Sequence, residues 1–165
     1  ILEKVDRIAG HHKERQAGEQ VDVSTEKQTD GKHDLHTQPQ HVATVLLVED
    51  DPLIAHMLRQ KLEAKNYGVF IAISENDIDT VLTEHTIGLI LLDILLPDLN
   101  GLVVLQKLKE DARYKNIPVI IISNLGQKEE IERGLAGGAE DYIVKANTYP
   151  DEIVSKVETV LAQKK

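Results

Sequence analysis

Five short apolar runs recur along residues 44–165, and they constrain the fold more than any other feature of the sequence. Each run holds five or six residues rich in Val, Ile and Leu, and most show no alternation of apolar and polar side chains. Continuous apolar runs of this length are typical of strands that are covered on both faces. The predicted strands are TVLLV (44–48), GVFIAI (68–73), GLILLD (88–93), PVIIIS (118–123) and DYIVK (141–145).

Amphipathic stretches follow the apolar runs, so five helices are predicted. The last one has apolar side chains along one face, Pro150 in its first turn and Thr148 as its expected N-cap. Five strands that alternate with five helices predict an α/β fold, in which a parallel sheet lies between two helical layers. The expected helices span 52–65, 75–85, 101–111, 127–136 and 150–163.

Polar side chains end the predicted strands. Ligands bind a doubly wound parallel sheet at the carboxyl ends of its strands, so these side chains are expected to converge. An acidic pair, a further acid, a hydroxyl and a lysine on four strands make a specific combination, whereas Ser74 after the second strand is not distinctive. The strand-end set is Glu49, Asp50, Asp51, Asp93, Ser123 and Lys145.

The acidic triplet 49–51 is unusual, because neighbouring carboxylates repel one another unless a positive charge lies among them. Asp51 precedes Pro52, and aspartate at the N-cap followed by proline is a common helix start. We therefore expect Asp51 to cap the helix 52–65, with metal binding as the alternative, and we expect a positive charge to lie near Glu49 and Asp50.

The segments VLLVEDD, LLDILLPDLNG, VIIISN and AEDYIVK, in this order and spacing, resemble the receiver domain of bacterial two-component response regulators. The resemblance covers residues 44–165. It implies a flavodoxin-like (βα)5 doubly wound fold, whose five-stranded parallel sheet has the order 2-1-3-4-5.

The resemblance implies that Asp93 is the phosphoacceptor, whose carboxylate attacks a phosphoryl group carried on a histidine of a partner kinase. Glu49 and Asp50 are implied to hold Mg²⁺ together with Asp93, with Mn²⁺ as a substitute. Leu95 is implied to supply a backbone carbonyl to the same ion. Clustered carboxylates suit a hard divalent cation, which prefers oxygen ligands.

Lys145 and Ser123 are implied to bind the phosphoryl oxygens, through an ammonium group and a hydroxyl group. In the family, movement of the hydroxyl residue couples to an aromatic residue on the fifth strand, which is matched here by Tyr142. Its change of rotamer would reshape a partner surface on the fourth helix, fifth strand and fifth helix, near 124–136, 142 and 148–160. The alternative for Tyr142 is a half-buried tyrosine with no switching role.

Two features depart from the family pattern. Ala146 follows Lys145 where the family usually has proline, often in cis, and proline is delayed to Pro150. A non-proline cis bond costs about 2.5–4 kcal/mol, so this loop either keeps an unusual cis peptide or is braced differently in trans. Leu95 and Leu125 occupy positions that often carry polar side chains able to orient attacking water, so a slowly hydrolysing phospho-form is expected.

Residues 1–43 contain no aromatic residue and few large apolar ones, so burial cannot offset the entropy cost of ordering them. We expect a polar linker or disordered tail before the domain 44–165. Residues 1–9 carry apolar side chains at helical spacing, which would fit a short helix. The histidines of this region are expected to be solvated rather than metal-bound; they are His11, His12, His33, His36 and His41.

Composition excludes several classes of function. Residues 44–165 hold 20 Asp and Glu against 13 Lys and Arg, a net charge of −7, so direct nucleic acid binding is not expected. The absence of cysteine excludes disulfides and thiol chemistry and permits a cytoplasmic location, which we expect. No apolar run approaches the roughly 18 residues of a membrane span, so membrane insertion is not expected.

The implied partners are a histidine kinase or histidine phosphotransfer protein, a downstream protein target, and a second copy bound through the helix-strand-helix surface. The chain would act as a stand-alone receiver, or as the C-terminal receiver of a hybrid histidine kinase with residues 1–43 as connector. A receiver-like module that binds partners without phosphorylation is the non-enzyme rival, and the complete acceptor set argues against it.

The enzyme rival is a Mg²⁺-dependent phosphohydrolase of the haloacid-dehalogenase type. Such enzymes need a second aspartate two residues after the nucleophile as general acid, and Leu95 is found there. We therefore expect a phosphoacceptor switch, not an enzyme, that assists only its own phosphorylation and dephosphorylation.

Overall fold

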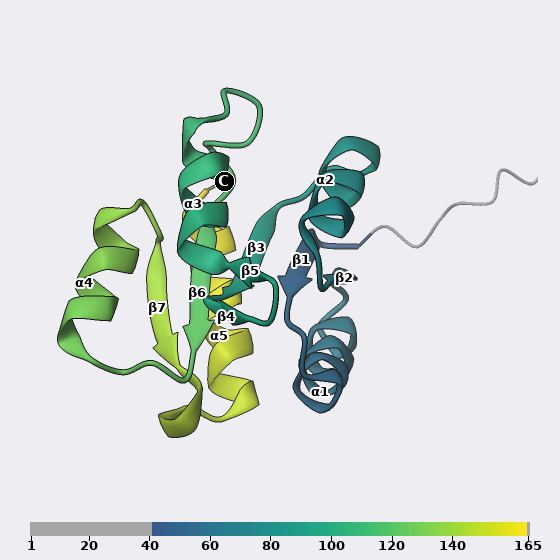
Figure 1. Cartoon of the computed structure of the whole chain (residues 1–165). Coiled ribbons are helices and arrows are strands. Elements are labelled where there is room, and N and C mark those ends of the chain that lie inside the picture. The colour runs from purple at the N-terminus through teal and green to yellow at the C-terminus, as the bar shows by residue number, and fades with distance from the viewer. Residues whose placement is uncertain (1–40, 165) are drawn as a thin grey trace, which may run out of the picture. The chain divides into compact units, whose positions relative to one another are not determined.

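A five-stranded parallel sheet forms the centre of the computed structural model, which describes residues 41–164 (Figure 1). Its strands lie in the order β2-β1-β3-β6-β7, and all neighbouring pairs are parallel. A short antiparallel hairpin, β4-β5, follows β3. The sheet strands are β1 (Thr44–Val48), β2 (Gly68–Ala72), β3 (Leu89–Asp93), β6 (Val119–Ser123) and β7 (Asp141–Val144), and the hairpin strands are β4 (Leu95–Leu96) and β5 (Leu99–Asn100).

Five α-helices alternate with the sheet strands, and their ends lie within one residue of the predicted ends. When the hairpin strands are left out of the count, the strand order is the predicted 2-1-3-4-5. The flavodoxin-like, doubly wound fold predicted from the sequence is therefore confirmed. The helices are α1 (Pro52–Ala64), α2 (Glu75–Glu84), α3 (Gly101–Glu110), α4 (Lys128–Ala136) and α5 (Pro150–Gln163).

Helices cover both faces of the sheet, and this explains the continuous apolar runs (Figure 1). In β1, Leu46 and Val48 pack into one core cluster with side chains of α2 and α3. Val45 and Leu47 pack into a second cluster with α1 and α5. Because successive side chains of a strand point to opposite faces, a strand between two helical layers needs an apolar residue at every position.

The N-terminus of α1 has the predicted cap. The Asp51 carboxylate accepts hydrogen bonds from the backbone amides of Leu53, at 2.8 Å, and Ile54, at 3.1 Å. Pro52 occupies the first helical position, where its missing N–H costs nothing because that amide has no partner within the helix. Asp51 therefore belongs to the helix rather than to a cation site.

The predicted cap of α5 is wrong by one residue. A 3-10 helix, η1 (Lys145–Asn147), follows β7, and the Thr148 amide donates to the Lys145 carbonyl at its end. Tyr149 is consequently the N-cap of α5, and its amide donates to the Glu152 carboxylate at 3.3 Å. The sequence did not indicate this extra turn, which moves the start of the helix past Thr148.

Most of the predicted tail lies outside the described residues, including the predicted helix 1–9 and the histidines before residue 40. His41 is described and exposed, and it takes no part in the metal-ligand cluster found among residues 41–164. None of the helices in this part of the chain combines the length and the apolar character needed to cross a bilayer.

The variant Asp51→Ala should lower the free energy of unfolding by about 0.5–2 kcal/mol, because two amides of the first turn lose their acceptor. Urea denaturation followed by circular dichroism would measure the change. Asp79→Ala removes an exposed carboxylate from within α2 and is the control, expected to have a smaller effect. An unchanged free energy in Asp51→Ala would contradict the capping role.

Candidate functional site

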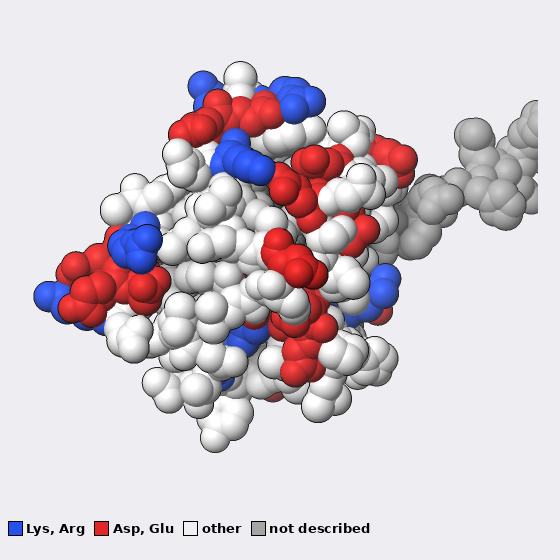
Figure 2. Space-filling view, in the orientation of Figure 1, with Lys and Arg blue, Asp and Glu red and all other residues white. Residues whose placement is uncertain are grey.

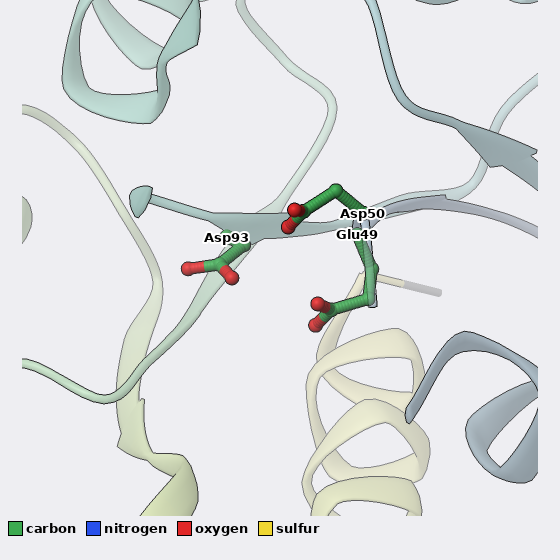
Figure 3. A group of neighbouring side chains, drawn as sticks. All are labelled: Glu49, Asp50 and Asp93. Atoms are coloured by element: carbon green, nitrogen blue, oxygen red, sulfur yellow. The ribbon is translucent and has the colours of Figure 1, made fainter. Parts of the chain in front are cut away.

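Three acidic side chains meet at the carboxyl edge of the sheet. Glu49 and Asp50 directly follow β1, and Asp93 ends the neighbouring strand β3, with Val48 paired to Leu92 in register. Figure 3 shows the three carboxylates extending from these two strand ends into the same space. One oxygen of each lies within 4.8 Å of one oxygen of each of the others. The predicted convergence of the acidic pair with Asp93 is confirmed as geometry.

Lys145 brings the positive charge that the acidic cluster needs. Its Nζ donates to Asp93 Oδ2 at 2.6 Å and to Glu49 Oε2 at 2.5 Å, and its side chain is only 9% exposed. Lys145 is far from Glu49 and Asp93 in the sequence, but it directly follows β7, which ends at the same edge of the sheet. The ammonium group therefore bridges two carboxylates that are themselves buried.

Burial and ion pairing oppose each other in this cluster. Burial raises the pKa of Glu49, and the hydrogen bond and charge of Lys145 offset this only in part. For Lys145, burial lowers the pKa of the ammonium group, but the hydrogen bonds to Asp93 and Glu49 outweigh it and raise the pKa overall. Lys145 therefore stays protonated at neutral pH.

The carboxylate of Asp93 is held at both oxygens. Oδ2 accepts from Lys145, and Oδ1 accepts from the Leu95 backbone amide at 3.0 Å. The chain then turns through the hairpin β4-β5 into α3, which begins at the buried Gly101. A Cβ at this position would lie 2.2 Å from the Asp93 carbonyl oxygen, so any side chain there would displace the backbone that carries Asp93.

Gly101 is a residue that the sequence reasoning missed. A glycine at the first residue of an expected helix was the available signal, because glycine is not a favoured helix former. A glycine is needed here because two backbone segments approach closely, not because of conformational freedom. The Gly101 amide donates to the Ile94 carbonyl at 3.0 Å, and this hydrogen bond holds α3 against the end of β3.

Ser123 and Tyr142 meet at the loop that follows β6. The Leu125 amide donates to Ser123 Oγ at 3.1 Å, and the Tyr142 hydroxyl donates to the Leu125 carbonyl at 2.8 Å. Tyr142 is buried rather than half-buried, and burial raises the pKa of its hydroxyl, partly offset by a hydrogen bond with Ser123. The two predicted switch residues thus hold one loop from both sides.

The three acids of the triplet have different environments. Glu49 is buried and paired with Lys145, Asp50 is exposed, and Asp51 caps α1. The Asp51 amide also donates to Glu49 Oε1 at 3.2 Å, which helps to fix the Glu49 side chain. Carboxylates from Glu49, Asp50 and Asp93 are the donor set that a hard divalent cation prefers, so the residues fit such an ion.

Comparison with known proteins agrees with this geometry. The family model described as "Response regulator receiver domain" matches residues 45–158. The phosphate regulon transcriptional regulatory protein PhoB of Rhizobium meliloti is 31% identical over 121 residues, which are 73% of this chain and 53% of PhoB. The DNA-binding dual master transcriptional regulator RpaA of Synechocystis is 32% identical, over 71% of this chain and 48% of RpaA. The chain thus spans about half the length of these curated relatives.

Solved structures agree with this assignment. The receiver domain of Francisella response regulator 1452 has a TM-score of 0.68 and 28% identity, and the match covers 74% of this chain and 99% of that one. The receiver domain of a signal transduction histidine kinase from Syntrophus aciditrophicus has a TM-score of 0.66 and 28% identity, over 73% and 91%. The chain belongs to the response regulator receiver domain family.

Proposed function

We propose that Asp93 accepts a phosphoryl group from a histidine of a kinase or phosphotransfer protein, and that this modification switches a protein-binding surface. The observation that carries the proposal is the position of the Asp93 carboxylate, which is bridged by Lys145 to Glu49 and lies beside Asp50. Phosphoryl transfer needs alignment and charge neutralisation, and three carboxylates with one ammonium group at the same edge of the sheet suit both needs.

In the transfer step, an Asp93 oxygen attacks the phosphorus atom as the bond from phosphorus to the donor imidazole nitrogen breaks, and that nitrogen keeps the electron pair. The product is an acyl phosphate on Asp93. Lys145 then pairs with a phosphoryl oxygen, and Ser123 donates its hydroxyl to another. The dianionic phosphoryl group then takes the place of the single carboxylate charge that Lys145 now neutralises on Asp93, so the negative charge at the site increases.

Mg²⁺, with Mn²⁺ as a substitute, is the proposed cofactor of this site. Glu49, Asp50, Asp93 and the Leu95 backbone carbonyl would hold it, with Glu49 acting directly or through water. When bound, the ion would neutralise the charge of the transferring phosphoryl group. The exposure of Asp50 supports this role, because a carboxylate at the rim of the acidic cluster can receive a hydrated ion from solvent.

Mass spectrometry after treatment with acetyl phosphate and Mg²⁺ tests the proposed function. The full chain should gain the mass of one phosphoryl group, and Asp93→Asn, which keeps the shape but removes the nucleophile, should gain none. A chain that folds, binds Mg²⁺ and gains no phosphoryl group would contradict the proposal and favour the phosphorylation-independent module.

The variant Asp50→Ala should abolish both Mg²⁺ binding and the phosphorylation of Asp93, since it removes the exposed metal ligand. Asp51→Ala removes the neighbouring carboxylate and is the matched control, which should keep both properties despite its lower stability. Isothermal titration calorimetry with Mg²⁺ and the mass measurement give the two readouts. Full Mg²⁺ binding by Asp50→Ala would show that the ion lies elsewhere.

The phospho-form should hydrolyse slowly, because Leu95 and Leu125 offer no polar group to orient attacking water beside Asp93. Leu95 is 52% exposed at the rim of the site, so its side chain can be replaced without loss of core packing. Leu95→Asn should shorten the half-life of phosphorylated chain in Mg²⁺ buffer, whereas Val103→Asn, on the exposed side of α3, should not. A wild-type half-life of seconds would contradict this prediction.

The proposed output surface is the face of α4, β7 and α5, which would bind a downstream protein or a second copy of the chain. Tyr142 on β7 is the proposed link to Asp93. Figure 2 shows Lys and Arg side chains scattered over the visible face rather than gathered in one patch, which supports a protein target over direct nucleic acid binding.

The linker role of residues 1–43 and the cytoplasmic location remain predictions. The chain as a stand-alone receiver, or as the C-terminal receiver of a hybrid histidine kinase, is a prediction too. The similarity to the receiver domain of the Syntrophus aciditrophicus histidine kinase supports the second alternative.

A further inference from the structure

Gly134, at the end of the second turn of α4, lies where the helix passes over the ring of Tyr142. A Cβ at Gly134 would lie 2.9 Å from Tyr142 Cδ2 and 2.6 Å from Ile121 Cδ1, both closer than real Cβ contacts. Ile121 and Tyr142 are neighbours across β6 and β7, so the glycine faces both strands. The buried Tyr142 ring therefore occupies the space in which the Cβ of any other residue at position 134 would lie.

The backbone does not explain this glycine. Gly134 lies inside a helix and is absent from the positive-φ positions of residues 41–164, so an alanine could adopt its conformation. Glycine inside a helix is less favourable than alanine. The less favourable glycine thus stands at a position where the methyl group of alanine would collide with an aromatic ring.

The position of the ring connects α4 to the phosphoacceptor site. With its ring beneath Gly134, Tyr142 places its hydroxyl 2.8 Å from the Leu125 carbonyl. The amide of Leu125 in turn donates to Ser123 Oγ. A continuous series of contacts therefore runs from the backbone of α4, through a tyrosine ring and one loop residue, to a hydroxyl at the carboxyl edge of the sheet.

We propose that Gly134 is a positioning residue that admits the Tyr142 ring under α4 and so permits the hydroxyl bond to the loop after β6. The inference rests on the proposed function, in which Ser123 binds the phosphoryl group and Tyr142 carries the change to α4. A side chain at position 134 favours a conformation in which the Tyr142 ring turns out to solvent. In that conformation the Tyr142 hydroxyl no longer contacts the loop after β6. Phosphorylation of Asp93 itself does not require the buried ring.

The test compares Gly134→Ala alone with Gly134→Ala in an Ile121→Val background. Valine lacks Cδ1, so in the double variant the added methyl group meets Tyr142 as its remaining close neighbour. Ile121→Val alone controls for the lost methylene. Gly137→Ala, at the C-cap of α4, controls for the replacement of a neighbouring glycine by alanine, since its Cβ would meet the Leu105 side chain at 3.0 Å and the Arg133 carbonyl at 3.2 Å but not the tyrosine.

The readouts are made on the full chain labelled with 3-fluorotyrosine, with the Tyr142 signal assigned by Tyr142→Phe. Fluorine NMR over a pH titration reports burial, because burial raises the pKa of the Tyr142 hydroxyl. Addition of beryllium fluoride and Mg²⁺ reports the response to a phosphoryl mimic. Mass spectrometry with acetyl phosphate reports phosphorylation of Asp93 separately.

In the double variant, the Tyr142 hydroxyl should titrate at lower pH than in the wild type, and its signal should lose the response to beryllium fluoride. Phosphorylation of Asp93 should persist, and both controls should behave as the wild type. A Tyr142 that titrates and responds as in the wild type would overturn the inference, because α4 would then have moved instead of the ring. Failure of the wild-type chain to be phosphorylated would instead overturn the proposed function.

Discussion

The shared ammonium group of Lys145 is the interaction on which the site depends. Two carboxylates buried at one edge of a sheet would each carry a large desolvation cost without a positive partner. Lys145 binds both Glu49 and Asp93, so neither is left unpaired. This requires the ends of β1, β3 and β7 to be held in fixed positions, which the fully buried apolar side chains of β1, β3 and β6 provide. Core packing thus sets the distances that the charges need.

The sequence predicted those parts of the structure that depend on local pattern and on the direction of the chain. Apolar runs without alternation indicated strands covered on both faces, and the observed strand ends differ from the predicted ends by one residue at most. Because all five strands are parallel, the residues after them had to meet at one edge, and this placed Glu49, Asp50 and Asp93 together. Asp51 was assigned to α1 from Pro52 alone, since capping is a local interaction.

The features that were missed depend on distances between segments that are remote in the chain. Nothing near Thr148 indicated the 3-10 helix before it, which arises where the chain leaves β7 with Lys145 turned toward the acids. From the sequence, Gly101 and Gly134 are only poor helix formers. The reason for each glycine is a neighbour from another element, the Asp93 backbone for Gly101 and the Tyr142 ring for Gly134. A glycine placed by close approach has no local signature beyond its cost to the helix.

The position of β6 explains how one modification can affect both sides of the site. This strand lies between β3, which carries Asp93, and β7, which carries Tyr142. Its last residue, Ser123, has its hydroxyl bonded to the loop that Tyr142 also holds. A phosphoryl group on Asp93 that accepts from the Ser123 hydroxyl would therefore draw toward Asp93 the same oxygen to which the Leu125 amide donates. Leu125 is bonded through both its amide and its carbonyl, so in the proposed switch a change at Ser123 would alter the contact of Tyr142 as well. The packing of the ring against α4 would then determine how the ring responds.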